Sequence, residues 1–283
     1  NLLSGLENRQ GLVDKLKNYF MTNYISLFAN GTIALELALT ALDLKGEVIT
    51  TPFTFPATIH SIVRNNLTPV FCDIKYEDYN IDENLIEKCI TKKTTAILPV
   101  HVYGIPCNVE AIDRIAKKYN LKVLYDAAHA FGVKLNNKSI ACFGDMSMFS
   151  FHPTKIFHTF EGGALTFSNK SYFEKLELLK NFGIVNEEEV ACVGTNGKIN
   201  EFQSGIGILL LEIIDEKIKA RKKIADLYIQ ELKEIESIKL PTFEQKNIFY
   251  NYSYFPILIK ENKKAINRNL IYDILKKNNI YSR

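Results

Sequence analysis

The chain has 283 residues, enough for one large or two modest domains, and its 35 basic and 32 acidic residues give a formal net charge of +3. Its 47% hydrophobic and 24% charged residues are typical of a globular protein and exclude a disordered, fibrous or disulfide-scaffold protein. The near balance of charge favours neither nucleic acid nor an anionic membrane as partner. No apolar run approaches the ~20 residues of a membrane-spanning helix and no signal peptide is visible, so we expect a cytoplasmic protein.

Strand-like and helix-like segments alternate from about residue 27 to residue 168. A strand over 26–29 precedes a helix in which Ile33, Leu37 and Ala41 share one face. An Asn108 cap and apolar residues at helical spacing predict another helix over 108–120. Short apolar runs predict further strands over residues 47–50, 69–72, 95–100, 122–126, 146–151 and 163–167. This alternation predicts an α/β fold with a mostly parallel sheet sandwiched by helices.

The pattern changes after about residue 200. Apolar residues at helical spacing predict a long helical stretch over 201–235. That stretch carries a run of basic residues, which we interpret as a solvated helix face rather than a binding patch: Lys217, Lys219, Arg221, Lys222 and Lys223. One strand over 254–259 and one helix over 264–278 are expected beyond it. We therefore expect a large domain over residues 1–205, then an interdomain helix with a smaller α+β domain over residues 206–283.

Polar residues stand at the expected carboxyl ends of strands, where α/β sheets bind ligands. The sequence Asn30-Gly31-Thr32 opens a helix whose N–H groups would favour a phosphate or carboxylate, although a simple helix cap has the same pattern. Asp126 ends an apolar strand, so its carboxylate needs a cationic or hydrogen-bonded partner or serves as a helix cap. His129, three residues further on, is either a packing residue or a catalyst.

The densest group of reactive residues is Phe-Ser-Phe-His-Pro-Thr-Lys, residues 149–155. Lys155 follows an apolar strand, where burial would disfavour its ammonium form. A lysine whose pKa lies below the usual ~10.4 can act as a nucleophile and form a Schiff base. The alternative is a surface lysine in a loop. The GxSxG, P-loop and GxGxxG motifs are all absent from the sequence.

Six motifs, in this order, resemble those of the DegT/DnrJ/EryC1/StrS family of sugar aminotransferases, which use pyridoxal phosphate (PLP). They lie at residues 30–34, 47–58, 99–104, 126–132, 149–163 and 194–201. The resemblance implies the type I fold of PLP enzymes. It also implies transfer of an amino group from glutamate to a nucleotide-linked keto sugar. Within the family, the segments around Asp126 and Lys155 most resemble dTDP-4-keto-6-deoxyhexose aminotransferases of the viosamine-synthase kind, which supply deoxyamino sugars for glycans such as O-antigen lipopolysaccharide.

The resemblance assigns the cofactor chemistry to particular residues. Lys155 would form the Schiff base with PLP and later move the proton, and Asp126 would keep the pyridine nitrogen protonated. Phe55 would stack on the ring. His129 replaces the glutamine that the family commonly has near the 3-hydroxyl group of the cofactor. His152 is a possible substrate-side residue.

The phosphate group of the cofactor has its own predicted ligands. Gly31, Thr32 and Ser150 would hold it through backbone N–H and hydroxyl groups. Asn196 would reach the cofactor of the neighbouring subunit, which implies a homodimer with a shared site. Lys198 stands where the family often has arginine, and since lysine lacks the planar fork we assign it no contact. No metal is expected.

Alternatives remain open. Amination at C3 instead of C4 would use the same motifs, and a regulatory relative could keep the fold without catalysis. The lysine at position 155 argues against such a relative, and also against a dehydratase branch that has histidine there. Compared with the family, we expect the chain to begin inside the N-terminal arm and to stop before the small domain is complete.

Overall fold

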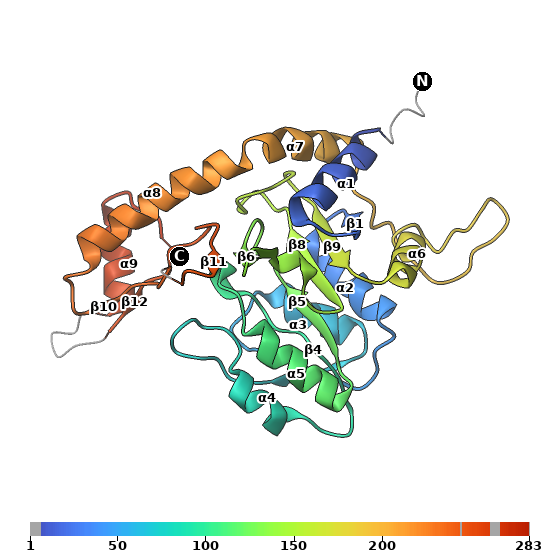
Figure 1. The fold of residues 1–283 in the computed structure, drawn as a ribbon, viewed down its shortest axis with the longest axis horizontal. Helices are drawn as coiled ribbons and strands as arrows, with labels where there is room; N and C mark the ends of the chain where they lie inside the picture. The colour runs from blue at the N-terminus through green and yellow to red at the C-terminus, as the bar shows by residue number, and fades with distance from the viewer. Residues whose placement is uncertain (1–6, 244, 261–266, 283) are drawn as a thin grey trace.

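The computed structural model describes residues 7–243, 245–260 and 267–282, and a seven-stranded sheet lies at its centre (Figure 1). The strand order is β1-β9-β8-β5-β4-β2-β3. The bounds are β1 Tyr24–Phe28, β2 Glu47–Thr50, β3 Thr68–Phe71, β4 Thr94–Ile97, β5 Lys122–Asp126, β8 Met146–Ser150 and β9 Gly163–Phe167. Only β9 runs against its neighbours in this sheet, so the predicted mostly parallel α/β fold is confirmed.

The central strands of the sheet are buried on both faces, which explains why apolar residues predominate on both sides of them. Along β5, Val123 and Tyr125 lie in one hydrophobic cluster and Leu124 lies in the other. The first cluster includes apolar residues of α1 and α5, and the second those of α2, α3 and α6. These helices and α4 span α1 Glu7–Phe20, α2 Gly31–Ala41, α3 Pro56–Arg64, α4 Glu83–Cys89, α5 Val109–Tyr119 and α6 Lys170–Leu179.

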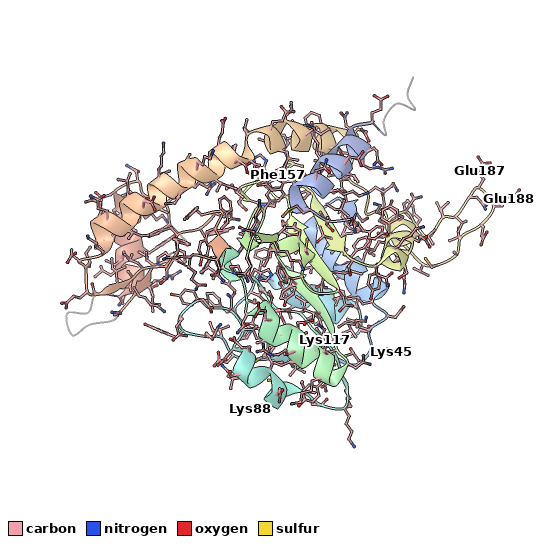
Figure 2. All side chains as sticks on the ribbon, in the orientation of Figure 1. Lys45, Lys88, Lys117, Phe157, Glu187 and Glu188 are labelled. Atoms are coloured by element: carbon pink, nitrogen blue, oxygen red, sulfur yellow. The ribbon has the colours of Figure 1, made fainter. Side chains whose placement is uncertain are left out.

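Aromatic rings fill the first cluster near the site. Phe157 is fully buried and stacks on Phe131, with ring centroids 4.3 Å apart. Charged side chains such as Lys88, Glu187 and Glu188 extend from the edges of the molecule instead (Figure 2). The stacking of Phe157 on Phe131 therefore holds the loop that follows β8 against the core.

Helices α7 (Glu201–Glu212) and α8 (Ile214–Leu232) carry the chain across the molecule to α9 (Arg268–Lys277), as Figure 1 shows. The predicted single stretch over 201–235 is thus two helices. They separate at Ile213, whose backbone N–H bonds the carbonyl of Leu210 instead of continuing the α-helical pattern. Helix α9 confirms the last predicted helix, although residues 264–266 of that prediction lie outside the described residues.

Five short strands lie outside the large sheet. Two follow β5, namely β6 Lys134–Leu135 and β7 Lys138–Ser139, and three lie in the C-terminal part, namely β10 Ile238–Lys239, β11 Ile248–Phe249 and β12 Leu258–Ile259. The strand predicted over 254–259 is only the two-residue β12, which pairs with β10. Strand β11 pairs with β6, so residues 248–249 are joined to the region that follows β5. No helix in the described part of the chain is long and apolar enough to cross a membrane.

Candidate active site

Asp126 and the loop that bears Lys155 lie side by side because they follow adjacent parallel strands. Asp126 is the last residue of β5 and is in register with Met148 of β8. The backbone N–H of Ala127 bonds the carbonyl of Met148 at 2.8 Å, which extends this pairing beyond β5. Lys155 follows β8 by five residues. The two predicted residues therefore meet at the carboxyl end of the sheet.

The Asp126 carboxyl group is almost fully buried and holds two hydrogen bonds. The Thr58 hydroxyl donates to Oδ2 at 2.7 Å, and the Ala128 backbone N–H donates to Oδ1 at 3.1 Å. Burial raises the pKa of Asp126, whereas these two hydrogen bonds and the positive charge of Lys155 act to lower it. A protonated pyridine nitrogen is the kind of cationic partner that would keep this carboxylate charged.

Thr58 is a site residue that sequence reasoning missed. It lies on α3, which begins with Pro56 at its first position and Phe55 as N-cap. Thr58 is fully buried and its hydroxyl also lies 2.7 Å from that of Thr54. Phe55 is 72% exposed at the same helix end. The start of helix α3 therefore places the hydrogen-bond donor to Asp126 close to the aromatic residue that is predicted to stack on the cofactor.

Tyr254 is a second residue that the sequence did not reveal. Its hydroxyl lies 3.4 Å from Lys155 Nζ, and its ring lies 4.5 Å from the His129 ring and 5.7 Å from that of Tyr103, between centroids. The backbone N–H of Tyr103 donates to His129 Nδ1 at 3.2 Å. Because Nδ1 accepts this bond, the proton of a neutral His129 lies on Nε2. The Nε2–H group could then donate to the 3-hydroxyl oxygen of a bound cofactor.

Asn251 ties the segment that bears Tyr254 to the segment that follows Asp126. Its Nδ2 atom donates to the carbonyls of His129 and Phe131 at 2.8 and 2.9 Å. Gly104 lies against the same contact, with a φ of +83°, and a Cβ there would stand 2.7 Å from the His129 carbonyl oxygen. The site is thus assembled from residues about 120 positions apart in the chain.

The predicted phosphate ligands meet at the start of α2. Asn30 caps this helix by accepting from the N–H of Ile33 at 2.9 Å. A Cβ on Gly31 would stand 3.1 Å from both Ser150 Cβ and Met148 Sδ, so the first turn of α2 lies directly on the end of β8. The helix N-terminus and the Ser150 hydroxyl are therefore close enough to bind one anion together.

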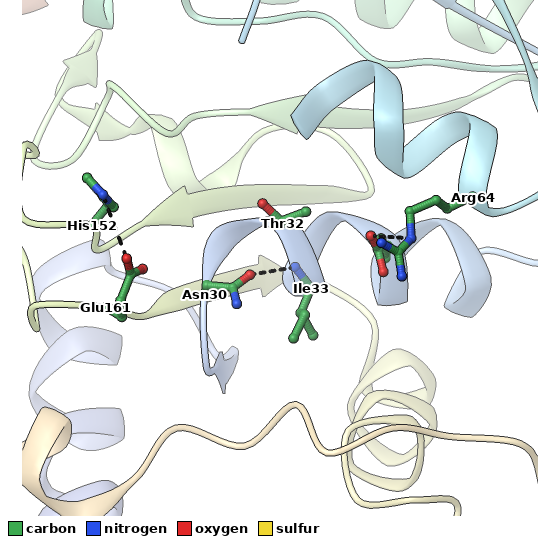
Figure 3. A pocket seen from close by; sticks show the side chains of 7 residues that line it. Asn30, Thr32, Ile33, Arg64, His152 and Glu161 are labelled. Atoms are coloured by element: carbon green, nitrogen blue, oxygen red, sulfur yellow. Dashed lines mark hydrogen bonds and ion pairs between the residues drawn. The ribbon is translucent and has the colours of Figure 1, made fainter. Parts of the chain in front are cut away.

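A cavity of about 460 Å³ opens beside this helix end (Figure 3). Within it, His152 Nε2 lies 3.7 Å from Glu161 Oε1, and Arg64 Nε lies 3.0 Å from Glu36 Oε1. The residues that line it are Asn30, Thr32, Ile33, Glu36, Arg64, His152 and Glu161. Each carboxylate of the cavity thus has a basic neighbour, and the N–H groups of Gly31 and Thr32 at the start of α2 are the kind of donors that bind an anion.

Asn196 lies on the exposed segment that follows α6. Its backbone bridges to that of Asn181, and its side chain is exposed. The next residue, Gly197, accepts from the N–H of Ala29 at 2.8 Å, one residue before the cap of α2. Lys198 instead donates to Asn181 Oδ1 at 2.7 Å. The contact of Asn196 with a neighbouring subunit stays a prediction.

These residues fit pyridoxal phosphate by their chemistry. A buried carboxylate in need of a cation, an adjacent lysine and a glycine-lined helix N-terminus match its ring nitrogen, its aldehyde and its phosphate. Among residues 7–243, 245–260 and 267–282, no group of three or more His, Cys, Asp and Glu side chains could hold a metal ion.

Residues 2–283 match the DegT/DnrJ/EryC1/StrS aminotransferase family. The chain is 48% identical over 274 residues to the dTDP-4-amino-4,6-dideoxy-D-glucose transaminase of Shigella dysenteriae, covering 97% of this chain and 74% of that protein. The enzyme of the same name from Escherichia coli is 47% identical over 278 residues, with the same coverage. The crystal structure of DesI with its TDP-sugar product has a TM-score of 0.92 at 28% identity, covering 98% of this chain and 70% of that one. The chain therefore belongs to the DegT/DnrJ/EryC1/StrS aminotransferase family, and it is an aminotransferase whose cofactor is pyridoxal phosphate.

Proposed function

We propose that this aminotransferase moves an amino group from glutamate to a dTDP-4-keto-6-deoxyhexose and forms a dTDP-4-amino-4,6-dideoxy sugar. The main support for aminotransferase chemistry is the buried Asp126 carboxylate, which accepts a hydrogen bond from Thr58 and lies near Lys155. The relatives at 48% and 47% identity support C4 as the aminated position, since both are named dTDP-4-amino-4,6-dideoxy-D-glucose transaminases.

Each site residue has a task in this reaction. When bound, the cofactor supplies an electron sink for removal of a proton from the carbon that carries the amino group. The Lys155 amine would take that proton and deliver it to the C4′ carbon of the cofactor. Asp126 holds a proton on the ring nitrogen through its negative charge, and His129 Nε2–H donates to the 3-hydroxyl position.

The remaining residues hold the cofactor in place. Gly31, Thr32 and Ser150 bind its phosphate through the start of α2 and the end of β8. The ring of Phe55, which is exposed, would cover one face of the pyridine ring. Asn196 extends to the phosphate site of the partner subunit in a homodimer.

The proposal includes a division of the chain and a place of action. A cofactor-binding domain covers residues 1–205, and an interdomain helix with a small domain covers residues 206–283. The group of β10, β12 and α9, which lies beneath the far end of α8 and away from the large sheet, supports that division (Figure 1). The enzyme acts in the cytoplasm, where nucleotide-linked sugars and glutamate serve as its substrates.

The test uses the purified protein with PLP. The unaltered enzyme should develop a visible absorption band, and Lys155→Ala should lose that band and at least about 100-fold in activity. Incubation with dTDP-4-keto-6-deoxyglucose and glutamate, followed by NMR of the product, then locates the new amine. An amine at C3 would replace the C4 assignment. Identical spectra and activity for Lys155→Ala and the unaltered enzyme would refute the proposed role of this lysine.

A further inference from the structure

A second cavity, of about 310 Å³, lies beside Lys155, between the loop after β8 and the first turns of α8. The loop contributes Thr154, Lys155 and His158, and α8 contributes Lys217, Ala220 and Arg221. Among the described residues that line this cavity, none is acidic, and three are cationic. The lining of the cavity is therefore positively charged, which favours an anionic ligand.

The spacing on α8 directs two cations toward the cavity. Lys217, Ala220 and Arg221 stand at i, i+3 and i+4, which places them on one helix face, and the small side chain of Ala220 leaves room between the other two. Lys217 and Arg221 are half-buried, whereas Lys219, Lys222 and Lys223 are exposed. Lys219, Lys222 and Lys223 thus lie on a solvated face, as the basic run predicted, whereas Lys217 and Arg221 are only partly exposed and line the cavity.

Two carboxylates of α8 bond elsewhere, and the exposed Glu216 is not among the residues that line the cavity. Asp215 accepts from the Tyr19 hydroxyl at 3.1 Å, and Asp226 accepts from Lys222 at 2.7 Å. His158 adds no negative charge, and within the described part of the chain its buried Nδ1 atom has no hydrogen-bond partner. Burial and, to a smaller extent, the charge of Lys217 lower the pKa of His158, so its ring favours the neutral form beside this lysine.

Arg221 also joins the cavity to the reaction centre. Its Nη1 atom donates to the carbonyl of Ser253 at 3.1 Å, and the next residue is Tyr254, whose hydroxyl lies 3.4 Å from Lys155 Nζ. An anion bound between Lys217 and Arg221 would therefore lie next to the lysine that handles the proton.

We propose that this cavity binds the diphosphate group of the nucleotide-linked sugar, with Lys217 and Arg221 as its cationic ligands. The inference rests on the proposed function. A diphosphate carries two neighbouring anionic groups, and side chains four apart on a helix stand about 5–6 Å apart at Cβ, so each cation can serve one phosphate. The sugar would then extend from the diphosphate toward Lys155. The carboxylates of glutamate are the other anions that could enter.

The test compares Lys217→Met with Lys219→Met, an exposed lysine two residues further along the same helix. The two half-reactions are followed separately through the cofactor spectrum, first with glutamate alone and then with the nucleotide sugar. Lys217→Met should raise KM for the nucleotide sugar about tenfold, with KM for glutamate and kcat within about twofold of the unaltered enzyme. Lys219→Met should leave both KM values unchanged.

Inorganic diphosphate provides a probe that needs no substitution. It should inhibit the unaltered enzyme competitively against the nucleotide sugar, and added salt should weaken that inhibition. A KM increase for glutamate alone, equal effects of both variants, or the absence of competition by diphosphate would overturn the inference. Those outcomes leave the proposed function standing, whereas an enzyme that reacts with glutamate but never aminates the sugar contradicts the function itself.

Discussion

The Thr58 hydroxyl donates a 2.7 Å hydrogen bond to Oδ2 of Asp126, from helix α3 to the end of strand β5. It is one of two hydrogen bonds that, together with the positive charge of Lys155, oppose the effect of burial on the pKa of this carboxyl group. Because a buried carboxylate is stable only when donors or cations surround it, Thr58 sets how readily Asp126 stays charged.

Thr58→Val should weaken binding of PLP about tenfold or more, since a hydrogen bond to a charged group contributes about 1.5–3 kcal/mol. Loss of the donor raises the pKa of Asp126 further, so the defect should grow as pH falls. Absorbance titrations with PLP at pH 8 and pH 6 measure both effects. Thr58→Ser keeps the hydroxyl and should bind normally. Equal affinities of the valine and serine variants at both pH values would contradict this role.

Tyr254→Phe should lower kcat about 2- to 10-fold, the effect of one neutral hydrogen bond, while KM for glutamate stays the same. The variant removes the hydroxyl 3.4 Å from Lys155 Nζ and keeps the ring beside His129. Tyr254→Ala should cost more, because the ring contacts are lost as well. Steady-state kinetics of both variants would show the split. An unchanged kcat for the phenylalanine variant would mean that the hydroxyl has no part in positioning Lys155.

Gly31→Ala should destabilise the protein by about 1–3 kcal/mol and weaken PLP binding, because the new methyl group would press on Ser150 and Met148 at 3.1 Å. Gly205→Ala on helix α7 is the matched control. The nearest atoms to a Cβ there belong to Asn8 and stand 3.9 Å away, so this variant should gain up to about 1 kcal/mol from helix propensity. Thermal unfolding with and without PLP measures both, and a Gly31→Ala variant as stable as the control would contradict the close contact.

The free energy of unfolding should decrease as pH falls, because the buried His101 resists protonation in the folded protein. Burial lowers its pKa to about 3, its Nδ1 accepts from the N–H of Cys107 at 3.0 Å, and its ring stacks on Tyr125. The unfolded chain binds the proton near pH 6.5, so the stability that His101 contributes is complete above that pH and is lost as pH falls from 6.5 toward 3. By pH 5 the loss should reach about 2 kcal/mol.

Urea unfolding at pH 7, 6 and 5 measures this loss. His101→Phe keeps an aromatic ring beside Tyr125 and cannot be protonated, so its stability should vary less with pH even if it is lower at pH 7. The same pH dependence in both proteins would assign the acid sensitivity to other groups.

A mixture of two defective variants tests the shared site. If Asn196 serves the cofactor of the partner subunit, a mixed dimer of Lys155→Ala and Asn196→Ala has one site with both defects and one intact site. Refolding equal amounts together should then restore about a quarter of the normal activity, because half of the dimers carry one working site. If Asn196 serves its own subunit, the mixture would remain as inactive as the two variants alone.

Local patterns predicted the strands and caps near the site. Strands β5 and β9 begin and end at the predicted residues, because apolar runs between polar turns leave little choice of boundary in a buried sheet. The Asn108 cap accepts from the N–H of Ala111, as its position before an amphipathic helix suggests. Asp126 and Lys155 could be singled out because Asp126 ends one such strand and Lys155 follows another by five residues.

Other parts depended on contacts between distant segments. Helix α1 was not predicted, although Leu12, Leu16 and Phe20 recur at helical spacing and are all buried. The roles of Thr58 and Tyr254 could not be read from local sequence, since Thr58 contacts Asp126 across 68 residues and Tyr254 reaches Lys155 across 99. A hydroxyl on a short helix or in an irregular segment carries no signal of its partner until the chain has folded.

The bonds from Asn251 to His129 and Phe131 also determine when the site can be completed during synthesis. The His129 segment leaves the ribosome 122 residues before Asn251, a delay on the order of ten seconds at typical elongation rates. Throughout that interval the nascent chain has Asp126 and later Lys155 but lacks Tyr254. We therefore expect the cofactor to bind after the sheet has begun to fold. A chain stalled before residue 251 should have a site that lacks Asn251 and Tyr254.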